Sequence, residues 1–162
     1  MIHLIVGNTG AGKTTYAHKL KEENKGIIFS IDKWNNILFM PDKTKEDKLD
    51  WMLERISRSE TLMMLYILQL EDNSVDSILD LGFSKFKHRE KFRNFAAKHN
   101  IKYQLHFLDS SKQIRENRIL KRNADKGITY EFNVKQEDFE FMETWFEPPN
   151  SSELKSAIHI KA

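Results

Sequence analysis

One eight-residue segment near the start of the chain constrains its fold more than any other feature. The segment Gly7-Asn8-Thr9-Gly10-Ala11-Gly12-Lys13-Thr14 matches the pattern G-x-x-x-x-G-K-[ST] at every fixed position. It follows a nearly all-apolar run, residues 2–6, which is typical of a strand buried on both faces of a sheet. A predicted helix over residues 13–23 comes next. A strand, a glycine-rich turn and a helix in this order predict an α/β fold with a parallel sheet.

The residue types in this segment, called the phosphate loop below, suit the binding of a polyphosphate. Glycines let the backbone curl so that several N–H groups point at one phosphate. The helix that begins here adds its unpaired N–H groups and its positive dipole end. Lys13 brings a cation to the β- and γ-phosphates, and Thr14 offers a hydroxyl to magnesium. We therefore expect ATP, or a closely related nucleoside triphosphate, to bind at Gly7, Asn8, Thr9, Gly10, Ala11, Gly12, Lys13, Thr14 and Thr15.

A dinucleotide-binding fingerprint is the closest alternative interpretation of the same glycines. Gly10-Ala11-Gly12 is followed about 20 residues later by Asp32, as in half of such a fingerprint. However, Thr15 stands where the third glycine belongs, and Lys13-Thr14 has no role in that motif. The phosphate-loop interpretation is therefore favoured.

Alternation of apolar runs with helix-like segments predicts an open α/β sheet in one domain that spans residues 1–162. No internal repeat or linker interrupts the chain. The expected strands are residues 2–6, 26–31, 77–81, 102–108 and 156–161, and the expected helices are residues 13–23, 46–70, 85–99, 111–123 and 136–146. Ligands of such sheets bind at the carboxyl ends of the strands, so those ends are where we look for chemistry.

Two aspartates stand at predicted strand ends. Asp32 follows the second strand, where a carboxylate can accept a proton from an attacking hydroxyl or bind magnesium through water. It is equally compatible with an N-cap for a turn that starts at Lys33. Asp80 closes the apolar run Ile78-Leu79, which is the Walker B pattern for a magnesium carboxylate. Beside a phosphate loop we favour this metal role for Asp80 over a simple turn.

Three arginines lie three and four residues apart on the predicted helix over residues 111–123. This spacing puts Arg115, Arg118 and Arg122 on one helix face. Such a face could close over a triphosphate and neutralise charge in the transition state. A solvated basic face is the alternative, but lysine would serve it equally well, so arginine at all three places favours phosphate.

Charge is unevenly placed although the formal net charge is only +2. Residues 85–122 hold 12 Lys or Arg against 3 Asp or Glu, which suggests a nearby anionic ligand, whereas residues 131–147 hold 6 acids against one Lys. The chain is not basic enough overall to indicate nucleic-acid binding. It has no cysteine, hence no disulfide framework or thiolate metal site. It has no membrane-length apolar run and no secretory leader, so we expect a cytoplasmic protein.

The motifs together resemble those of small bacterial P-loop kinases that group with chloramphenicol phosphotransferase, zeta toxins and polynucleotide kinase, and in particular the AAA family ATPase or ATP-binding members of that group. The matching segments are the phosphate loop, Ser30-Ile31-Asp32-Lys33-Trp34, Leu79-Asp80-Leu81-Gly82-Phe83, Arg115 to Asn123, and Phe146-Glu147-Pro148-Pro149. The resemblance covers nearly the whole chain and implies a five-stranded parallel sheet in the order 2-3-1-4-5 with helices on both faces.

The resemblance also implies roles for individual residues. It makes Asp32 the general base, places Arg115, Arg118 and Arg122 in a lid at about residues 111–135, and puts Pro148 near the adenine. With Lys13 on the phosphates and Thr14 and Asp80 on Mg²⁺, we expect a kinase that moves the γ-phosphoryl of Mg-ATP to a hydroxyl of a small molecule.

Two other functions stay open at this point. One is a polynucleotide 5′-hydroxyl kinase, which needs a basic, partly aromatic groove. The other is a slow ATPase switch that binds a partner protein and needs no acceptor pocket. The aromatics Trp34, Phe39, Trp51 and Phe83 could line such a pocket, although core packing explains each of them more simply.

Overall fold

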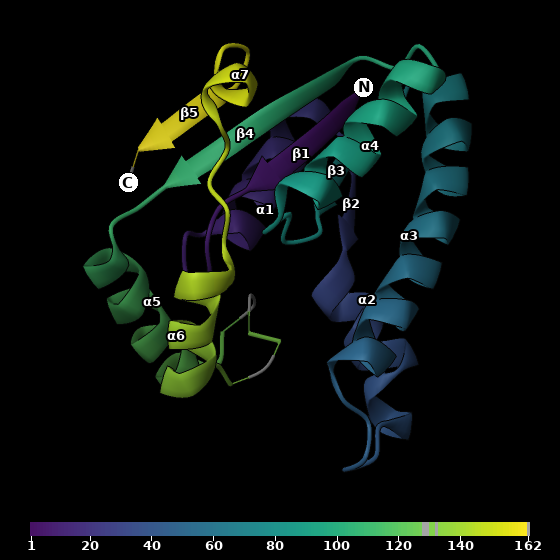
Figure 1. Ribbon diagram of the computed structural model, residues 1–162. Helices are drawn as coiled ribbons and strands as arrows, with labels where there is room; N and C mark the ends of the chain where they lie inside the picture. Colours follow the sequence, from purple (N-terminus) through teal and green to yellow (C-terminus); the bar gives the residue numbers. More distant parts are fainter. Residues whose placement is uncertain (128–129, 132, 162) are drawn as a thin grey trace.

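Five parallel strands form one sheet in this computed structural model, which describes residues 1–127, 130–131 and 133–161 (Figure 1). The order across the sheet is β2-β3-β1-β4-β5, which confirms the order implied by the resemblance. All five residues of β1 are buried, and this strand lies in the middle, where Leu4 pairs with Leu79 on one side and Leu105 on the other. The strands are β1 (Ile2–Val6), β2 (Ile27–Ser30), β3 (Ser77–Asp80), β4 (Tyr103–Asp109) and β5 (Ile158–Lys161).

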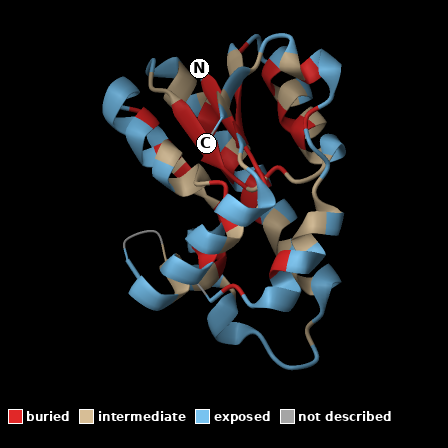
Figure 2. Cartoon of the chain, turned by 90° about the vertical axis from the view of Figure 1, so that its left-hand side faces the viewer, coloured by how far each residue is buried: buried red, intermediate tan, exposed pale blue. Residues whose placement is uncertain are grey.

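Helices cover both faces of the sheet, as predicted. Because side chains alternate along a strand, Leu4 and Val6 point to one face and Ile5 to the other. The first face packs against α3 (Leu49–Asp72) and α4 (Phe86–Lys98), and the second packs against α1 (Lys13–Asn24). Figure 2 shows the buried residues concentrated in the strands and in the helix faces turned toward them.

Helices α5 (Lys112–Asp125) and α6 (Gln136–Trp145) lie side by side below the carboxyl ends of the strands (Figure 1). They share a small apolar cluster of their own, made by Ile119, Val134 and Phe139. This cluster is separate from the two sheet cores, so these helices are attached to the rest of the molecule largely through polar contacts.

Two short helices were missed by the sequence prediction. Helix α2 (Ile31–Leu38) begins where the second strand was expected to continue, because the Ser30 hydroxyl accepts a hydrogen bond from the Lys33 amide and caps it. Helix α7 (Ser151–Leu154) is capped by the side chain of Asn150 in the same way. A single 3₁₀ turn, η1 (Met40–Asp42), completes the elements. None of the helices within the described ranges is long and apolar enough to span a membrane.

Candidate functional site

The phosphate loop joins the carboxyl end of β1 to α1 and curls through two glycines with positive φ. Gly10 has φ 81° and Gly12 has φ 94°, conformations that residues with a side chain rarely adopt. At Gly10 a Cβ atom would also lie 2.6 Å from the carbonyl oxygen of Arg115. Helix α1 has Gly12 as its N-cap and no side-chain cap, so its first amides remain available to an anion.

A hydroxyl and a carboxylate meet beside this loop. Thr14, in the first turn of α1, donates its hydroxyl hydrogen bond to Oδ2 of Asp80 at 2.7 Å. Asp80 ends β3, which is the immediate neighbour of β1, and its side chain is buried. Oxygen ligands of this kind suit Mg²⁺, which binds proteins through one or two such groups plus substrate phosphates. The described residues contain no cluster of three or more His, Cys, Asp or Glu that could hold a metal ion.

Asp32 comes directly after β2, the strand that pairs with β3. Ser30 at the end of β2 pairs with Asp80, and Asp32 lies in the first turn of α2. The alternative that Asp32 is the helix N-cap is wrong, since Ser30 has that position. Asp32 is exposed to solvent, although many protein atoms surround its carboxylate. This desolvation, then the negative charge of Asp80, raises the pKa of Asp32 to about 6, while the charge of Lys13 opposes the shift.

Lys13 is half-buried among charges of both signs. Its ammonium donates a 3.3 Å hydrogen bond to the carbonyl oxygen of Asn8 in its own loop. Burial lowers the pKa of Lys13, the carboxylates of Asp80 and Asp32 oppose this, and the nearby guanidinium groups of Arg122 and Arg115 add to it. The predicted phosphate cation thus lies within electrostatic reach of both predicted aspartates.

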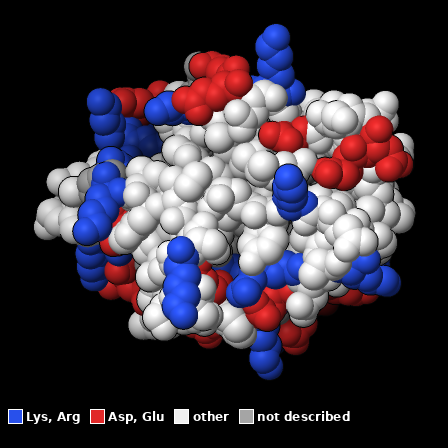
Figure 3. Space-filling view, turned by 90° about the horizontal axis from the view of Figure 1, so that it is seen from above, with Lys and Arg blue, Asp and Glu red and all other residues white. Residues whose placement is uncertain are grey.

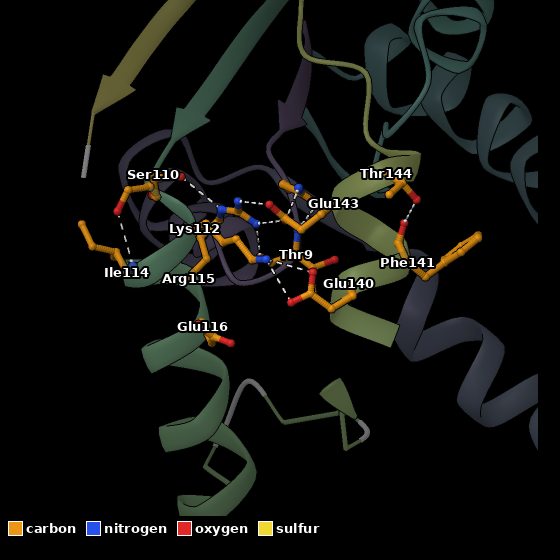
Figure 4. A network of polar contacts seen from close by, with 12 residues as sticks. Thr9, Ser110, Lys112, Ile114, Arg115, Glu116, Glu140, Phe141, Glu143 and Thr144 are labelled. Carbon is orange, nitrogen blue, oxygen red and sulfur yellow. Dashed lines mark hydrogen bonds and ion pairs between the residues drawn. The ribbon is translucent and has the colours of Figure 1, made fainter. Parts of the chain in front are cut away.

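Arg115 is buried and fixed by a network that joins α5, α6 and the phosphate loop (Figure 4). Its Nη2 donates to Oε2 of Glu143 at 2.8 Å and its Nη1 contacts Oε1 of the same carboxylate. It also donates to the carbonyl oxygens of Ser110 and Thr9, at 3.0 and 3.3 Å. Oε1 of Glu143 further accepts a 2.7 Å hydrogen bond from the side-chain amide of Asn8. Arg115 therefore holds the loop in place through Glu143.

Arg118 and Arg122 are held less firmly than Arg115. Arg118 is exposed and donates to the carbonyl oxygen of Ala11 at 3.2 Å and to the Ser110 hydroxyl at 3.4 Å. The Nε of Arg122 is buried and has no hydrogen-bond partner among the described residues. Arg115 and Arg118 thus contact carbonyl oxygens of the phosphate loop, and the charge of Arg122 acts on Lys13. The remainder of the expected lid, residues 111–135, includes residues 128–129 and 132, which lie outside the described residues.

The basic and acidic segments of the sequence neutralise each other in part. Ion pairs join Lys112 to Glu140 at 2.8 Å, Arg115 to Glu143, and Lys85 to Glu147 at 3.1 Å. On the face viewed in Figure 3, basic and acidic side chains stand beside one another around a largely uncharged middle.

A small cavity of about 130 Å³ adjoins the phosphate loop on the side of β4. Apolar and polar groups meet in it, as in most nucleotide-base sites. It brings Pro148, predicted to lie near the adenine, together with Asn8 and Arg115. The residues around it include Asn8, Phe107, Ser110, Arg115, Phe146 and Pro148.

The sequence analysis missed Glu143. Its carboxylate is the junction between the loop residue Asn8 and Arg115, and these ion-pair and hydrogen-bond partners lower its pKa. The only sequence signal was the acidic run over residues 131–147, which does not indicate which glutamate faces the basic helix.

Comparison with known proteins supports this description. A family model described as an AAA domain matches residues 2–149. A search of curated proteins found no matching sequence.

Several solved structures share the fold at low sequence identity. A sugar kinase from Janibacter sp. HTCC2649 is 19% identical with a TM-score of 0.62, over 99% of this chain and 84% of its own. Kti12 from Chaetomium thermophilum, in complex with ADP-AlF3, is 11% identical with a TM-score of 0.70, over 100% and 88%. The Mycobacterium tuberculosis APS kinase CysC, with AMPPNP and APS, is 16% identical with a TM-score of 0.67, over 99% and 87%. At these identities the likeness shows a P-loop kinase-like fold.

Proposed function

This chain belongs to the AAA domain family, and we propose that it is a magnesium-dependent kinase that transfers the γ-phosphoryl group of ATP to a hydroxyl of a small molecule. The observation that carries the proposal is the presence of two separate carboxylates at the site. Asp80 is bonded to Thr14, which suits the metal, and Asp32 stands apart with a pKa raised to about 6. An ATPase switch would use the second group to position water, whereas in the proposed kinase it acts on the acceptor hydroxyl.

The nucleotide would bind with its phosphates against the loop amides and Lys13. Its adenine would enter the cavity beside Phe146 and Pro148, at the far end of the loop. Arg115 already has a carboxylate partner, so its role is to position α5 and Asn8. Arg118 and Arg122 would neutralise charge on the transferring group.

Thr14 and Asp80 would hold Mg²⁺, which neutralises phosphate charge when it is bound. Asp32 would accept the proton of the acceptor hydroxyl as the new bond from oxygen to the γ-phosphorus forms and the bond to the ADP oxygen breaks. A pKa near 6 is well matched to this task, because the group is ionised at neutral pH and is a stronger base than an ordinary carboxylate.

A pair of variants tests the assignment of the two aspartates. Asp32→Asn should keep Mg-ATP affinity within a few-fold and slow single-turnover phosphoryl transfer by roughly a hundredfold, the usual scale of acid–base catalysis. Asp80→Asn should instead raise the magnesium concentration needed for ATP binding. Since Ser30 caps α2, the first substitution leaves the helix cap intact.

Screening small hydroxyl compounds for acceptor-stimulated ADP release identifies a substrate for these titrations. If Asp32→Asn loses Mg-ATP binding but transfers phosphate normally once saturated, the roles of the two aspartates are exchanged. If no hydroxyl compound accelerates ADP release while a partner protein does, the molecule is an ATPase switch. Acceleration by single-stranded oligonucleotides with a steep salt dependence would instead identify a polynucleotide kinase.

A further inference from the structure

A second and larger cavity, of about 280 Å³, lies between α3, α4 and the end of α6. Its walls are mostly apolar: Leu53 and Ile56 come from α3, Phe83 from the segment after β3, and Trp145 from the last turn of α6. Of the four aromatics singled out in the sequence, Phe83 alone lines it. Trp34 packs against the sheet core, and the Arg55 guanidinium stacks on Trp51 at 3.6 Å.

The charged groups around this cavity already have partners. The carboxylate of Glu60 is buried, and its Oε2 accepts a 2.6 Å hydrogen bond from the ammonium of Lys91. The Nε2 of His88 lies 2.6 Å from Oε1 of the same carboxylate, without hydrogen-bond geometry. Lys85 is paired with Glu147 at 3.1 Å and lies 4.2 Å from the centre of the Trp145 ring.

Two serine hydroxyls and the imidazole of His88 are the remaining polar side-chain groups in the lining. Ser57 and Ser84 make no side-chain hydrogen bond among the residues that the structure describes. A polyol needs a partner for each hydroxyl it buries, because a buried hydroxyl without a partner weakens binding. A site with only these partners between aromatic and aliphatic walls suits a ligand with few hydroxyls.

The cavity lies next to the chain segment that leaves the end of β3. Leu81, another lining residue, comes directly after Asp80, and Gly82 follows with φ 81°. A Cβ atom added at Gly82 would meet nothing closer than the Ser84 hydroxyl at 4.0 Å, so the backbone here borders open space. A molecule seated against Phe83 would therefore approach the strand ends that hold Asp80 and Asp32.

We propose that this cavity binds the acceptor, and that the acceptor is an alcohol on an apolar ring, aromatic or alicyclic, rather than a polyol sugar. That this ligand is the phosphoryl acceptor rests on the proposed kinase function. The chemical class of the ligand rests on the lining of the cavity alone. The volume of about 280 Å³ is near the lower end of the range for small-molecule sites, which fits a single-ring molecule. The ring would lie between Trp145 and Ile56, with its polar substituents toward Ser57 and Ser84.

The experiment uses the full chain with Mg²⁺ and a non-hydrolysable ATP analogue. Ligand-observed NMR titration compares two ring alcohols, 2-phenylethanol and cyclohexylmethanol, with glucose and gluconate. We expect the ring alcohols to bind at least tenfold more tightly than the two polyols. The blocking variant is Ser57→Trp, which fills the cavity from an exposed position on α3 and should weaken ring-alcohol binding at least tenfold.

Gln69→Trp is the matched control, since it adds the same ring at an exposed site on the same helix, about 18 Å away at 1.5 Å per residue. It should leave ring-alcohol binding unchanged, and both variants should keep the affinity for the ATP analogue. Tighter binding of the polyols, equal ring-alcohol binding in Ser57→Trp, or no binding of any of the four compounds overturns the inference.

The same titrations separate this inference from the proposed function. Ring alcohols that bind in the cavity, with no hydroxyl compound that stimulates ADP release from ATP, leave the ligand class standing and refute the kinase assignment. Glucose or gluconate that stimulates ADP release refutes the ligand class and leaves the kinase assignment standing.

Discussion

The phosphate-loop region and the cavity beside α3 differ in how their charged side chains are paired. At the loop, Lys13, Arg118 and Arg122 have no carboxylate within ion-pair distance among the described residues, and the partners of Lys13 and Arg118 are carbonyl or hydroxyl oxygens. Around the cavity, Glu60 is matched by His88 and Lys91, and Lys85 is matched by Glu147.

This difference indicates what each region is built to receive. A site for a polyanion keeps its cations available, since a ligand that supplies the missing charge is then bound strongly. A site for an uncharged molecule cancels its charges internally and leaves apolar walls for contact. Substitutions that remove these charged groups test the difference, and they are described from the largest expected effect to the smallest.

The largest effect is expected at Lys13. Lys13→Ala removes an uncompensated cation from the proposed phosphate site and should weaken ATP binding by about a hundredfold, the scale of a lost charge-assisted contact. The thermal unfolding midpoint should not fall, because the ammonium makes one long bond to its own loop. Isothermal titration calorimetry and a thermal melt measure both quantities.

Lys85→Ala is the comparison from the other region. This lysine is already neutralised by Glu147, so its loss should change ATP affinity by less than about twofold. Equal losses in the two variants would show that the regions do not differ in the way described above.

The next effect concerns Arg118. Arg118→Ala should slow phosphoryl transfer by about thirtyfold and change ATP affinity by less than about threefold, because such a cation acts mainly on charge that develops in the transition state. Single-turnover kinetics and equilibrium binding provide the two numbers. Lys121→Ala, at an exposed position on the same helix, is the control and should leave both unchanged.

A pH effect of about tenfold is expected from Asp32. Its pKa is raised to about 6, so the carboxylate that accepts the proton is present above pH 6 and is lost as the pH falls below it. At pH 5 about one molecule in ten keeps the base, and the transfer rate should fall by about that factor. The residual rate of Asp32→Asn should lack this acidic limb. If the transfer rate of Asp32→Asn falls over the same pH range, the titrating group is another residue.

The smallest effect is expected at Glu143. Glu143→Gln keeps the size of the side chain but removes the charge that pairs with Arg115, so the loop residue Asn8 is held less firmly. ATP affinity should fall by about threefold to fivefold. The melting temperature should drop by about 2–4 °C, as for a loss of ~1 kcal/mol in a domain of this size. Glu140→Gln, whose pair with Lys112 is exposed, should change neither quantity measurably.

The phosphate-loop region was more predictable from sequence than the cavity region, because its main residues lie close together in the sequence or follow recognisable strands. The eight loop residues are consecutive, and Asp32 and Asp80 each follow an apolar strand, so pattern and topology together place them at one edge of the sheet. The contacts of Glu143 with Asn8 and of Glu60 with Lys91 join residues 135 and 31 positions apart, and no local pattern marks them.

Local competition explains the elements that were missed. Residues 26–31 were predicted to form one continuous strand, but the Ser30 hydroxyl caps a helix and the strand ends at Ser30. Trp145 was expected to belong to a helix, and it does. That its ring faces the cavity depends on how α6 packs, which the sequence does not reveal.

The central position of β1 determines when the sheet can form during synthesis on the ribosome. This strand is made before both of its neighbours, yet β3 and β4 end at Asp80 and Asp109. At ~5–20 residues per second, the first strand waits about 5–20 s for its second partner. During that interval the glycine-rich turn has no sheet to hold its shape, so nucleotide capture on a growing chain begins only after most of the polypeptide has emerged.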